Sequence, residues 1–107
     1  MANAMNPGFL TWKHANKFVD GSAMSAAQYV GTELSLDGKA AVSIPVAWAA
    51  DGNYNFPIAS LGTLTNATHT WGVRIAASNG LKSGLVAGPA FDIDTRVPAD
   101  PFGLTVS

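Results

Sequence analysis

Short runs of alternating apolar and polar residues, separated by turn signals, constrain this chain more than any other feature. In the clearest run, residues 71–77, the apolar side chains fall on one side of a period-two pattern: Trp71, Val73, Ile75 and Ala77. This is the side-chain period of a β-strand with one buried face. The run stops at Ser78-Asn79-Gly80, a typical turn sequence in which Gly tolerates a positive φ. The stretch therefore predicts a half-buried strand that other strands must flank.

Similar runs recur along the 107 residues, a length that suits one domain, and no stretch has a convincing helical period. They predict about seven short strands: residues 9–12, 28–36, 39–48, 56–64, 71–77, 85–93 and 102–106. Asp20, Asp37 and Asp51 each precede a Gly, which is turn chemistry. Short strands at this spacing predict an all-β fold, a two-sheet antiparallel β-sandwich.

Asp37-Gly38 joins two of these strands as a hairpin. A two-residue loop would set Val42 opposite Glu33 and put the two apolar sets on opposite faces. A three-residue loop, 36–38, sets Val42 opposite Thr32, and the faces then agree. We therefore predict the three-residue loop with Gly38 in the left-handed conformation. Pro45 removes a ladder donor and predicts an edge strand or an irregularity there.

The composition excludes several classes of protein. The chain has no cysteine, so it forms no disulfide and has no thiol nucleophile or cysteine-ligated zinc. No apolar run approaches the ~18 residues of a membrane-spanning segment. The net charge is -1, and scattered basic residues argue against nucleic-acid binding: Lys13, Lys17, Lys39, Arg74, Lys82 and Arg96. Residues 1–6 lack the basic and apolar regions of a signal peptide, so we expect synthesis in the cytoplasm without Sec export.

The histidines, His14 and His69, are the first candidates for catalysis. A Ser–His–Asp triad would need one of them beside a serine and an aspartate, and only His69, with Ser60 and Asp51, is open to that interpretation. We interpret both histidines as structural or solvated, because no catalytic motif surrounds them. The sequence predicts a protein that is not an enzyme, with no catalytic residue and no cofactor.

Acidic residues offer a weak metal site. Asp92 and Asp94 are two residues apart and would share one face of a strand, with Asp100 nearby. Carboxylates can hold Ca²⁺ when further oxygen ligands join them. We interpret these acids as a solvated face beside a linker and expect no metal. The sequon Asn66-Ala67-Thr68 is treated as accidental.

Aromatic side chains are the remaining candidates for binding, because they stack on sugars: Trp12, Tyr29, Trp48, Tyr54, Phe56, Trp71 and Phe91. We assign Trp12 and Trp71 to the core. Trp48 and Tyr54 stand beside a turn and are predicted to be the exposed pair.

In order and spacing, these segments resemble a fibronectin type III domain, an immunoglobulin-like sandwich. Leu10-Thr11-Trp12 resembles its strand B, and Asp20-Gly21-Ser22 followed by Tyr29 resembles its B–C loop and strand C. Residues 64–77 resemble the E–F corner and strand F, and residues 79–83 resemble the F–G turn. The resemblance implies a sandwich with strands B to G within residues 1–97.

The chain departs from that family in three places. The corner usually carries a Tyr where this chain has Thr70, with Trp71 following, so the tyrosine-corner hydrogen bond is not expected. The F–G loop has no Arg-Gly-Asp, so integrin binding is not implied. No strand A precedes Leu10, and an apolar strand instead follows the proline-containing linker 94–101.

The missing strand A leads to the main expectation about partners. A sandwich without it exposes a sheet edge and part of its core. Residues 98–107 complete the sandwich either in cis or in a neighbouring subunit, as in donor-strand complementation, unless they are the start of a further domain. The predicted partner-binding residues are Phe102, Leu104 and Val106.

The function expected from these features is a non-catalytic structural or assembly module. A phage virion protein, such as a capsid decoration, head fibre or tail-associated module, fits a fibronectin-like domain that assembles in a host cytoplasm and acts through protein partners, as a homo-oligomer or in a larger assembly. The alternative is a carbohydrate- or cell-surface-binding module of a larger secreted protein, which would be extracellular and have an exposed aromatic patch. Fold alone does not choose between these functions.

Overall fold

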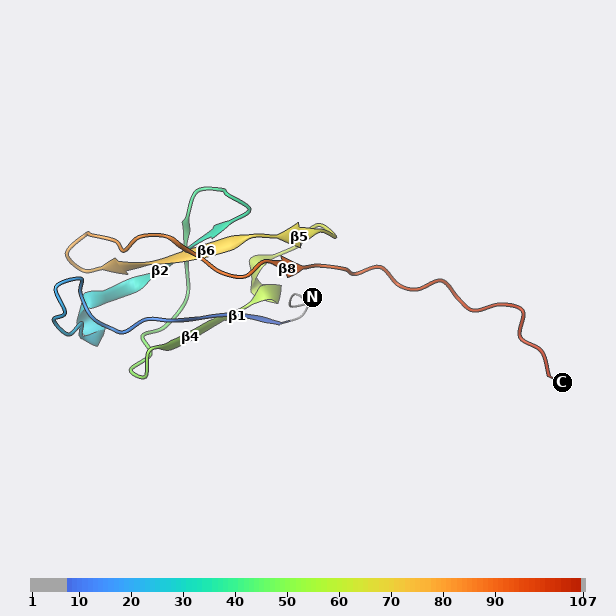
Figure 1. Ribbon diagram of the computed structural model, residues 1–107, viewed down its shortest axis with the longest axis horizontal. Helices are drawn as coiled ribbons and strands as arrows, with labels where there is room; N and C mark the ends of the chain where they lie inside the picture. The colour runs from blue at the N-terminus through green and yellow to red at the C-terminus, as the bar shows by residue number, and fades with distance from the viewer. Residues whose placement is uncertain (1–7, 107) are drawn as a thin grey trace.

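The computed structural model describes residues 8–106 as an all-β fold of antiparallel strands packed in layers (Figure 1). The predicted absence of a signal peptide concerns residues 1–6, which lie outside the described residues. Eight strands lie in the described part: β1 (Phe9–Lys13), β2 (Tyr29–Leu36), β3 (Val42–Ile44), β4 (Asn53–Pro57), β5 (Thr68–His69), β6 (Trp71–Ala77), β7 (Val86–Ala87) and β8 (Phe91–Asp92). Two short 3-10 turns accompany them, η1 (Ala26–Gln28) and η2 (Ile58–Leu61).

The strands form two layers. One layer is the sheet β3-β2-β6-β7, and the pair β1-β4 lies opposite it. A third pair, β5-β8, continues the β6-β7 ladder, because only Thr70 separates β5 from β6 and residues 88–90 separate β7 from β8. The predicted fold class, an antiparallel β-sandwich, is confirmed, with eight strands in three sheets instead of about seven in two.

The core lies between the layers and follows the predicted alternation. In β6, Trp71, Val73 and Ile75 are buried and face the opposite layer, whereas Arg74 is half-buried on the outer face. Trp71 and Val73 belong to a core cluster whose other buried members are Leu10, Leu34, Ile44, Phe56, Ile58, Phe91 and Ile93. At roughly 1.5–3 kcal/mol for each large side chain, this burial is the main force that holds the two layers together.

The predicted hairpin register is wrong. Asp37 has φ 53 and Gly38 has φ 74, and the Lys39 N–H donates to the Leu36 carbonyl at 3.0 Å, so the turn is a two-residue type I′ turn. The ladder then sets Val42 opposite Leu34 and Ile44 opposite Thr32. Residues 39–41 form an irregular stretch with one extra residue, and this shift puts the alternating apolar positions of β2 and β3 on the same face of the sheet. The prediction that these positions share a face was therefore right, but an extra residue in the strand achieves this, and not a longer loop.

Two predicted strands have different limits in the structure. The strand predicted over residues 39–48 ends at Ile44, directly before Pro45, which has no N–H for the ladder. The strand predicted over residues 56–64 begins earlier, at Asn53, and passes after Pro57 into η2. Ile58 is buried there as expected.

The strand predicted over residues 85–93 is interrupted around Trp71. A Cβ on Gly88 would lie 2.2 Å from a ring atom of Trp71, so only Gly lets the backbone pass the indole. The Trp71 indole N–H donates to the Pro89 carbonyl at 2.6 Å. The chain between β7 and β8 therefore wraps one edge of this ring and satisfies its polar atom.

Candidate functional site: an open strand edge and an exposed apolar segment

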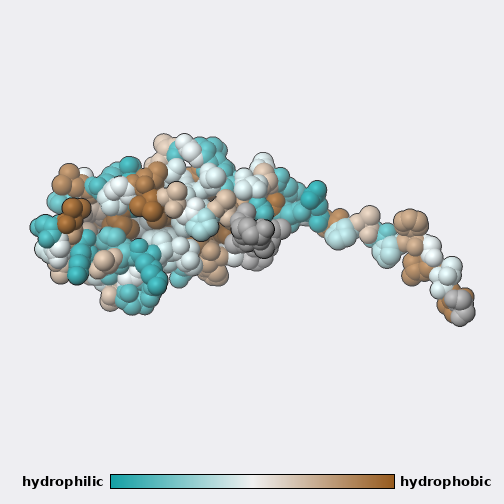
Figure 2. Space-filling model, viewed as in Figure 1, coloured by the Kyte–Doolittle hydropathy of each residue, from teal (hydrophilic) through white to brown (hydrophobic). Residues whose placement is uncertain are grey.

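The C-terminal segment, residues 96–106, projects away from the sandwich (Figure 1). The described chain has principal extents of 73 × 27 × 23 Å as a result. No strand forms over residues 102–106, and Gly103 has φ 69, which breaks the extended run. The predicted partner-binding side chains are strongly exposed, with Phe102 at 94%, Leu104 at 78% and Val106 at 100%. Figure 2 shows this projection carrying apolar side chains into solvent.

The free edge of β1 is the second feature of the site. The Ile58 N–H donates to the Gly8 carbonyl, and the His14 N–H donates to the Gly52 carbonyl, so residues 8 and 14 turn their backbone groups toward β4. Backbone groups alternate along an antiparallel ladder. The N–H and C=O of Phe9, Thr11 and Lys13 therefore point to the side of β1 that has no described strand neighbour.

The free edge of β4 differs from that of β1. By the same alternation, Pro57 faces the outer side of β4, where it provides no N–H and its ring blocks the approach of another strand. None of the three β1 residues whose backbone groups point away from β4 is a proline. One of them is Phe9, whose apolar side chain is 60% exposed. Of the two edges of this sheet, that of β1 is the one suited to an added strand.

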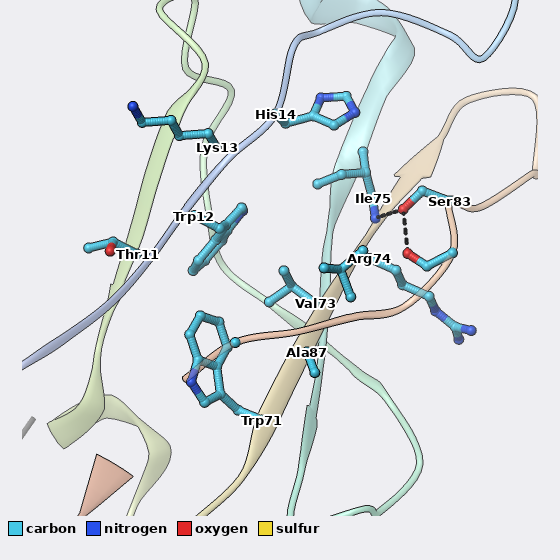
Figure 3. A pocket seen from close by; sticks show the side chains of 13 residues that line it. Thr11, Trp12, Lys13, His14, Trp71, Val73, Arg74, Ile75, Ser83 and Ala87 are labelled. Carbon is cyan, nitrogen blue, oxygen red and sulfur yellow. Dashed lines mark hydrogen bonds between the residues drawn. The ribbon is translucent and has the colours of Figure 1, made fainter. Parts of the chain in front are cut away.

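A groove lies beside the β1 edge, between the two layers (Figure 3). It has a volume of about 300 Å³, roughly ten times the ~30 Å³ that one water molecule occupies. Its floor is formed by Trp12 of β1 and by Trp71 and Val73 of β6, and Val86 and Ala87 of β7 form the far wall. The site thus combines unpaired backbone groups with an apolar floor.

Trp12 is the residue of β1 whose ring forms part of the floor of this groove. Its ring stacks on Tyr54 with a centroid distance of 6.2 Å and an interplanar angle of 7°, and its centroid lies 6.2 Å from that of Trp71. Its indole N–H is buried and has no hydrogen-bond partner among the described residues. A buried unsatisfied donor costs about 1–3 kcal/mol, so within the described residues the hydrogen bonding at this edge of the sandwich is incomplete.

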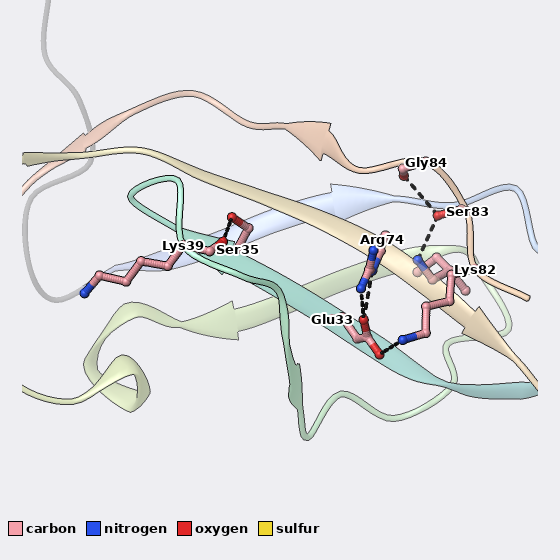
Figure 4. A network of polar contacts seen from close by, with 8 residues as sticks. Glu33, Ser35, Lys39, Arg74, Lys82, Ser83 and Gly84 are labelled. Carbon is pink, nitrogen blue, oxygen red and sulfur yellow. Dashed lines mark hydrogen bonds and ion pairs between the residues drawn. The ribbon is translucent and has the colours of Figure 1, made fainter. Parts of the chain in front are cut away.

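A charged cluster lies on the outer face of the larger sheet, which is the face of β2 and β6 that points away from β1 and β4 (Figure 4). The Glu33 carboxylate accepts from Arg74 Nε at 2.8 Å and pairs with Lys82 Nζ at 2.8 Å. These contacts, that with Lys82 first, lower the pKa of Glu33. The cluster ties β2 to β6 and to the turn after it. Its charges are paired with one another, which makes it a structural feature of the sheet.

His69 is structural, as the sequence suggested, and it does not meet Ser60 or Asp51. Its ring is 5% exposed and stacks on Phe91. Nδ1 lies 2.7 Å from Asp37 Oδ2, and Nε2 lies 2.8 Å from the Thr65 carbonyl oxygen. Both partners are acceptors, so only the protonated ring donates to both. The bond to Thr65 raises the pKa of His69, with Asp37 as the second cause, and His69 lowers that of Asp37.

We call this contact between the His69 ring and the Asp37 carboxylate the His69–Asp37 latch. It lies at the corner before β6, where the sequence has Thr70 and no tyrosine. Asp37 also accepts the Thr70 backbone N–H at 3.0 Å, so one carboxylate holds the hairpin turn against the corner. This contact could not be predicted from the sequence, because the two residues are 32 positions apart. The only local signal was an Asp in a turn, and that signal also has a purely local explanation.

The acidic and glycosylation candidates make contacts with neighbouring residues. Asp92 accepts from the Thr68 hydroxyl at 2.5 Å, and Asp94 pairs with Arg96, which lowers the pKa of Asp94 to about 2. Asn66 accepts from the backbone and hydroxyl of Thr95, each at 3.0 Å. Within residues 8–106 no group of three or more metal-ligating side chains occurs. No helix in that range is long and apolar enough to cross a membrane.

The predicted exposed aromatic pair is wrong. Tyr54 is 3% exposed, because β4 turns it inward against Trp12. Its hydroxyl donates to Asn16 Oδ1 at 2.9 Å. Trp48 is half-buried, with its ring centroid 5.8 Å from that of Tyr29. The assignment of Trp71 to the core is confirmed, and Trp12 packs against the core at its open edge.

Comparison of the chain with protein-family models, with curated proteins and with solved structures finds no match. The geometry of the site is therefore the basis on which a function can be proposed.

Proposed function

We propose that this chain is a non-catalytic assembly module that acts through protein–protein contacts. One observation carries the proposal: three large apolar side chains at alternate positions of the C-terminal segment are 78% exposed or more, Phe102, Leu104 and Val106. Burying such a side chain stabilises a complex by roughly 1.5–3 kcal/mol. An exposed apolar row of this kind is typical of a surface that a partner covers.

The strand order supports the fibronectin-like part of the proposal. In an immunoglobulin-like sandwich strand B lies beside E, and C, F and G are neighbours in the other sheet. β1 beside β4 corresponds to the first pair, and the order β2-β6-β7 corresponds to the second set. On this assignment the strand that the described residues lack is A, at the free edge of β1.

The setting that we propose is a tailed-phage particle, in which the chain is a capsid decoration, head fibre or tail-associated module. A charge-poor chain, with 12% charged residues, is compatible with such a particle. The test is mass spectrometry of purified particles of the phage or prophage that encodes the chain, with immunogold labelling. We expect stoichiometric copies at one region of the particle. Absence of the chain from intact particles would overturn the virion setting.

A carbohydrate-binding module was the alternative, and it depended on an exposed aromatic pair. Because Tyr54 is buried and Trp48 packs against Tyr29, the structure provides no such pair at that turn. A glycan array on the full chain, with Trp48→Ala as the control, tests this alternative. Specific binding that Trp48→Ala abolishes would favour it over assembly.

A further inference from the structure

We propose that the groove beside β1 binds residues 102–106 of a second copy of this chain, which adds an antiparallel strand to the β1 edge. This inference rests on the proposed assembly function and names its partner and acceptor. The donor is the segment that carries the exposed apolar row, and the acceptor is the open edge with Trp12 and Trp71 behind it.

The direction of the chain favours a second copy over a return in cis. β1 begins at the end of the sandwich where β8 finishes, and the chain after β8 leaves from that end (Figure 1). A segment that folded back along its own β1 would therefore run parallel to it. Every strand pair in the described residues is antiparallel. A neighbouring copy can approach from the opposite end and pair antiparallel, the slightly more stable arrangement.

Length and chemistry match between donor and acceptor. Both β1 and the segment 102–106 have five residues, which is about 17 Å of extended chain. Between Pro98 and Val106 the charged residue is Asp100, whereas the titratable side chains that line the groove are all basic: Lys13, His14 and Arg74. Arg74 is already paired with Glu33, and Lys13 and His14 lie at the end of β1 at which the incoming aspartate arrives.

The alternation fixes the register. The apolar donor residues must face the groove, so they stand opposite inward-facing positions of β1. Leu104 opposite Trp12, with Val106 opposite Leu10, meets this condition. Gly103 and Thr105 then exchange hydrogen bonds with Lys13 and Thr11, whose backbone groups point outward. Pro101, which has no N–H, stays outside these pairs.

Gly103 allows the segment to change from its conformation in the isolated chain to the extended conformation of the proposed strand. Its φ of 69 interrupts the extended conformation in the isolated chain. Gly adopts extended and left-handed conformations without a steric penalty, so pairing can straighten the segment. Such a contact is head-to-tail, because each copy gives a segment and receives one. Repetition then produces a ring or an open filament.

The experiment uses two full-length variants. Thr11→Pro removes an outward N–H from β1 and leaves the β1-β4 ladder intact, with Thr11→Val as the matched control. Leu104→Asp puts a charge on the donor, with Leu104→Ile as the control. Sedimentation velocity and light scattering over a dilution series measure association. We expect the wild type and both controls to associate, and each variant to weaken association at least about tenfold.

Mixing the two variants is the decisive step. Thr11→Pro keeps an intact segment and Leu104→Asp keeps an intact groove, so the mixture should form a heterodimer of twice the monomer mass that stops growing. A mixture that stays monomeric overturns the inference. A wild type that stays monomeric up to about 1 mM overturns it as well, because a contact weaker than that is negligible. Association that neither variant weakens overturns the inference and leaves the proposed assembly function standing.

A second measurement does not depend on the folding of Thr11→Pro. A labelled synthetic peptide of residues 98–107 is titrated into the Leu104→Asp chain, whose groove is unchanged, and fluorescence anisotropy reports binding. We expect saturable binding that is lost when the peptide carries Leu104→Asp. Equal binding of the two peptides would contradict the proposed register, and absence of binding by both would overturn the inference.

Discussion

β6 and the segment 102–106 have the same alternating apolar pattern, but their surroundings are opposite. β6 lies between β2 and β7, and its inward side chains Trp71 and Val73 are 6% and 8% exposed. Residues 102–106 have no described strand beside them, and their apolar side chains are 78% exposed or more. Alternation therefore determines which side chains share a face. Whether that face is covered depends on a neighbouring strand, which the pattern does not specify.

The largest effect that this comparison predicts is at Trp71. Trp71→Ala removes a buried ring from the core and the hydrogen bond to Pro89, so we expect a loss of about 3–5 kcal/mol of unfolding free energy. Urea denaturation followed by circular dichroism at low protein concentration measures it. A loss below about 1 kcal/mol would mean that the ring is not part of the core.

The next effect is at the glycine that accommodates this ring. Gly88→Ala places a Cβ within 2.2 Å of Trp71, and the overpacking should cost about 1–3 kcal/mol. Gly84→Ala is the matched control, because nothing lies within 4 Å of its new Cβ. Equal unfolding midpoints in urea for the two variants would show that the interruption between β7 and β8 does not depend on the ring.

The His69–Asp37 latch should make stability depend on pH. The raised pKa of His69 means that its contribution is complete below its unfolded value of about 6.5 and is lost as the pH rises through the folded pKa. The lowered pKa of Asp37 means that its contribution is complete above about 3.8 and is lost as the pH falls. We expect the latch to stabilise most between about pH 4 and 6.5.

Urea midpoints at about pH 5 and pH 8 test this window. The wild type should lose stability between them, and Asp37→Asn should lose less, because the protonated His69 then has no carboxylate partner. A variant that shows the full wild-type decline would show that the pH dependence does not come from this pair.

The smallest effect on stability is expected in the exposed segment. Phe102→Ala should change the unfolding free energy of the dilute chain by less than about 0.5 kcal/mol, because the side chain is 94% exposed. The same variant at high concentration should associate less than the wild type. A large loss of stability in dilute solution would show that the segment packs on its own sandwich, and would remove the contrast with β6.

Much of the fold was accessible from the sequence because it depends on local patterns. The alternation in residues 71–77 predicted the burial of the three large apolar side chains of β6, although Ala76 is buried as well and Ala77 is only half-buried. Asp37-Gly38 predicted a turn. The limits of β3 and β4 were harder to predict from the sequence, since a proline such as Pro45 or Pro57 is compatible both with an edge strand and with the end of a strand.

The candidate site was accessible only in part. The apolar row at Phe102, Leu104 and Val106 was visible in the sequence. The groove was not, because its floor joins Trp12 to Trp71, which are far apart in the chain. The burial of Tyr54 was missed for the same reason, since a turn nearby suggested exposure and only packing on Trp12 decides it.

The class of fold, the positions of most turns and the inward face of β6 could be predicted from the sequence. These follow from backbone stereochemistry and side-chain period, which act over a few residues. Only contacts in the tertiary structure determine the hairpin register, the His69–Asp37 latch and the side of β1 that has no described strand neighbour. Each of these depends on contacts between segments distant in the chain, where packing and hydrogen bonding select one pairing among several that the local pattern permits.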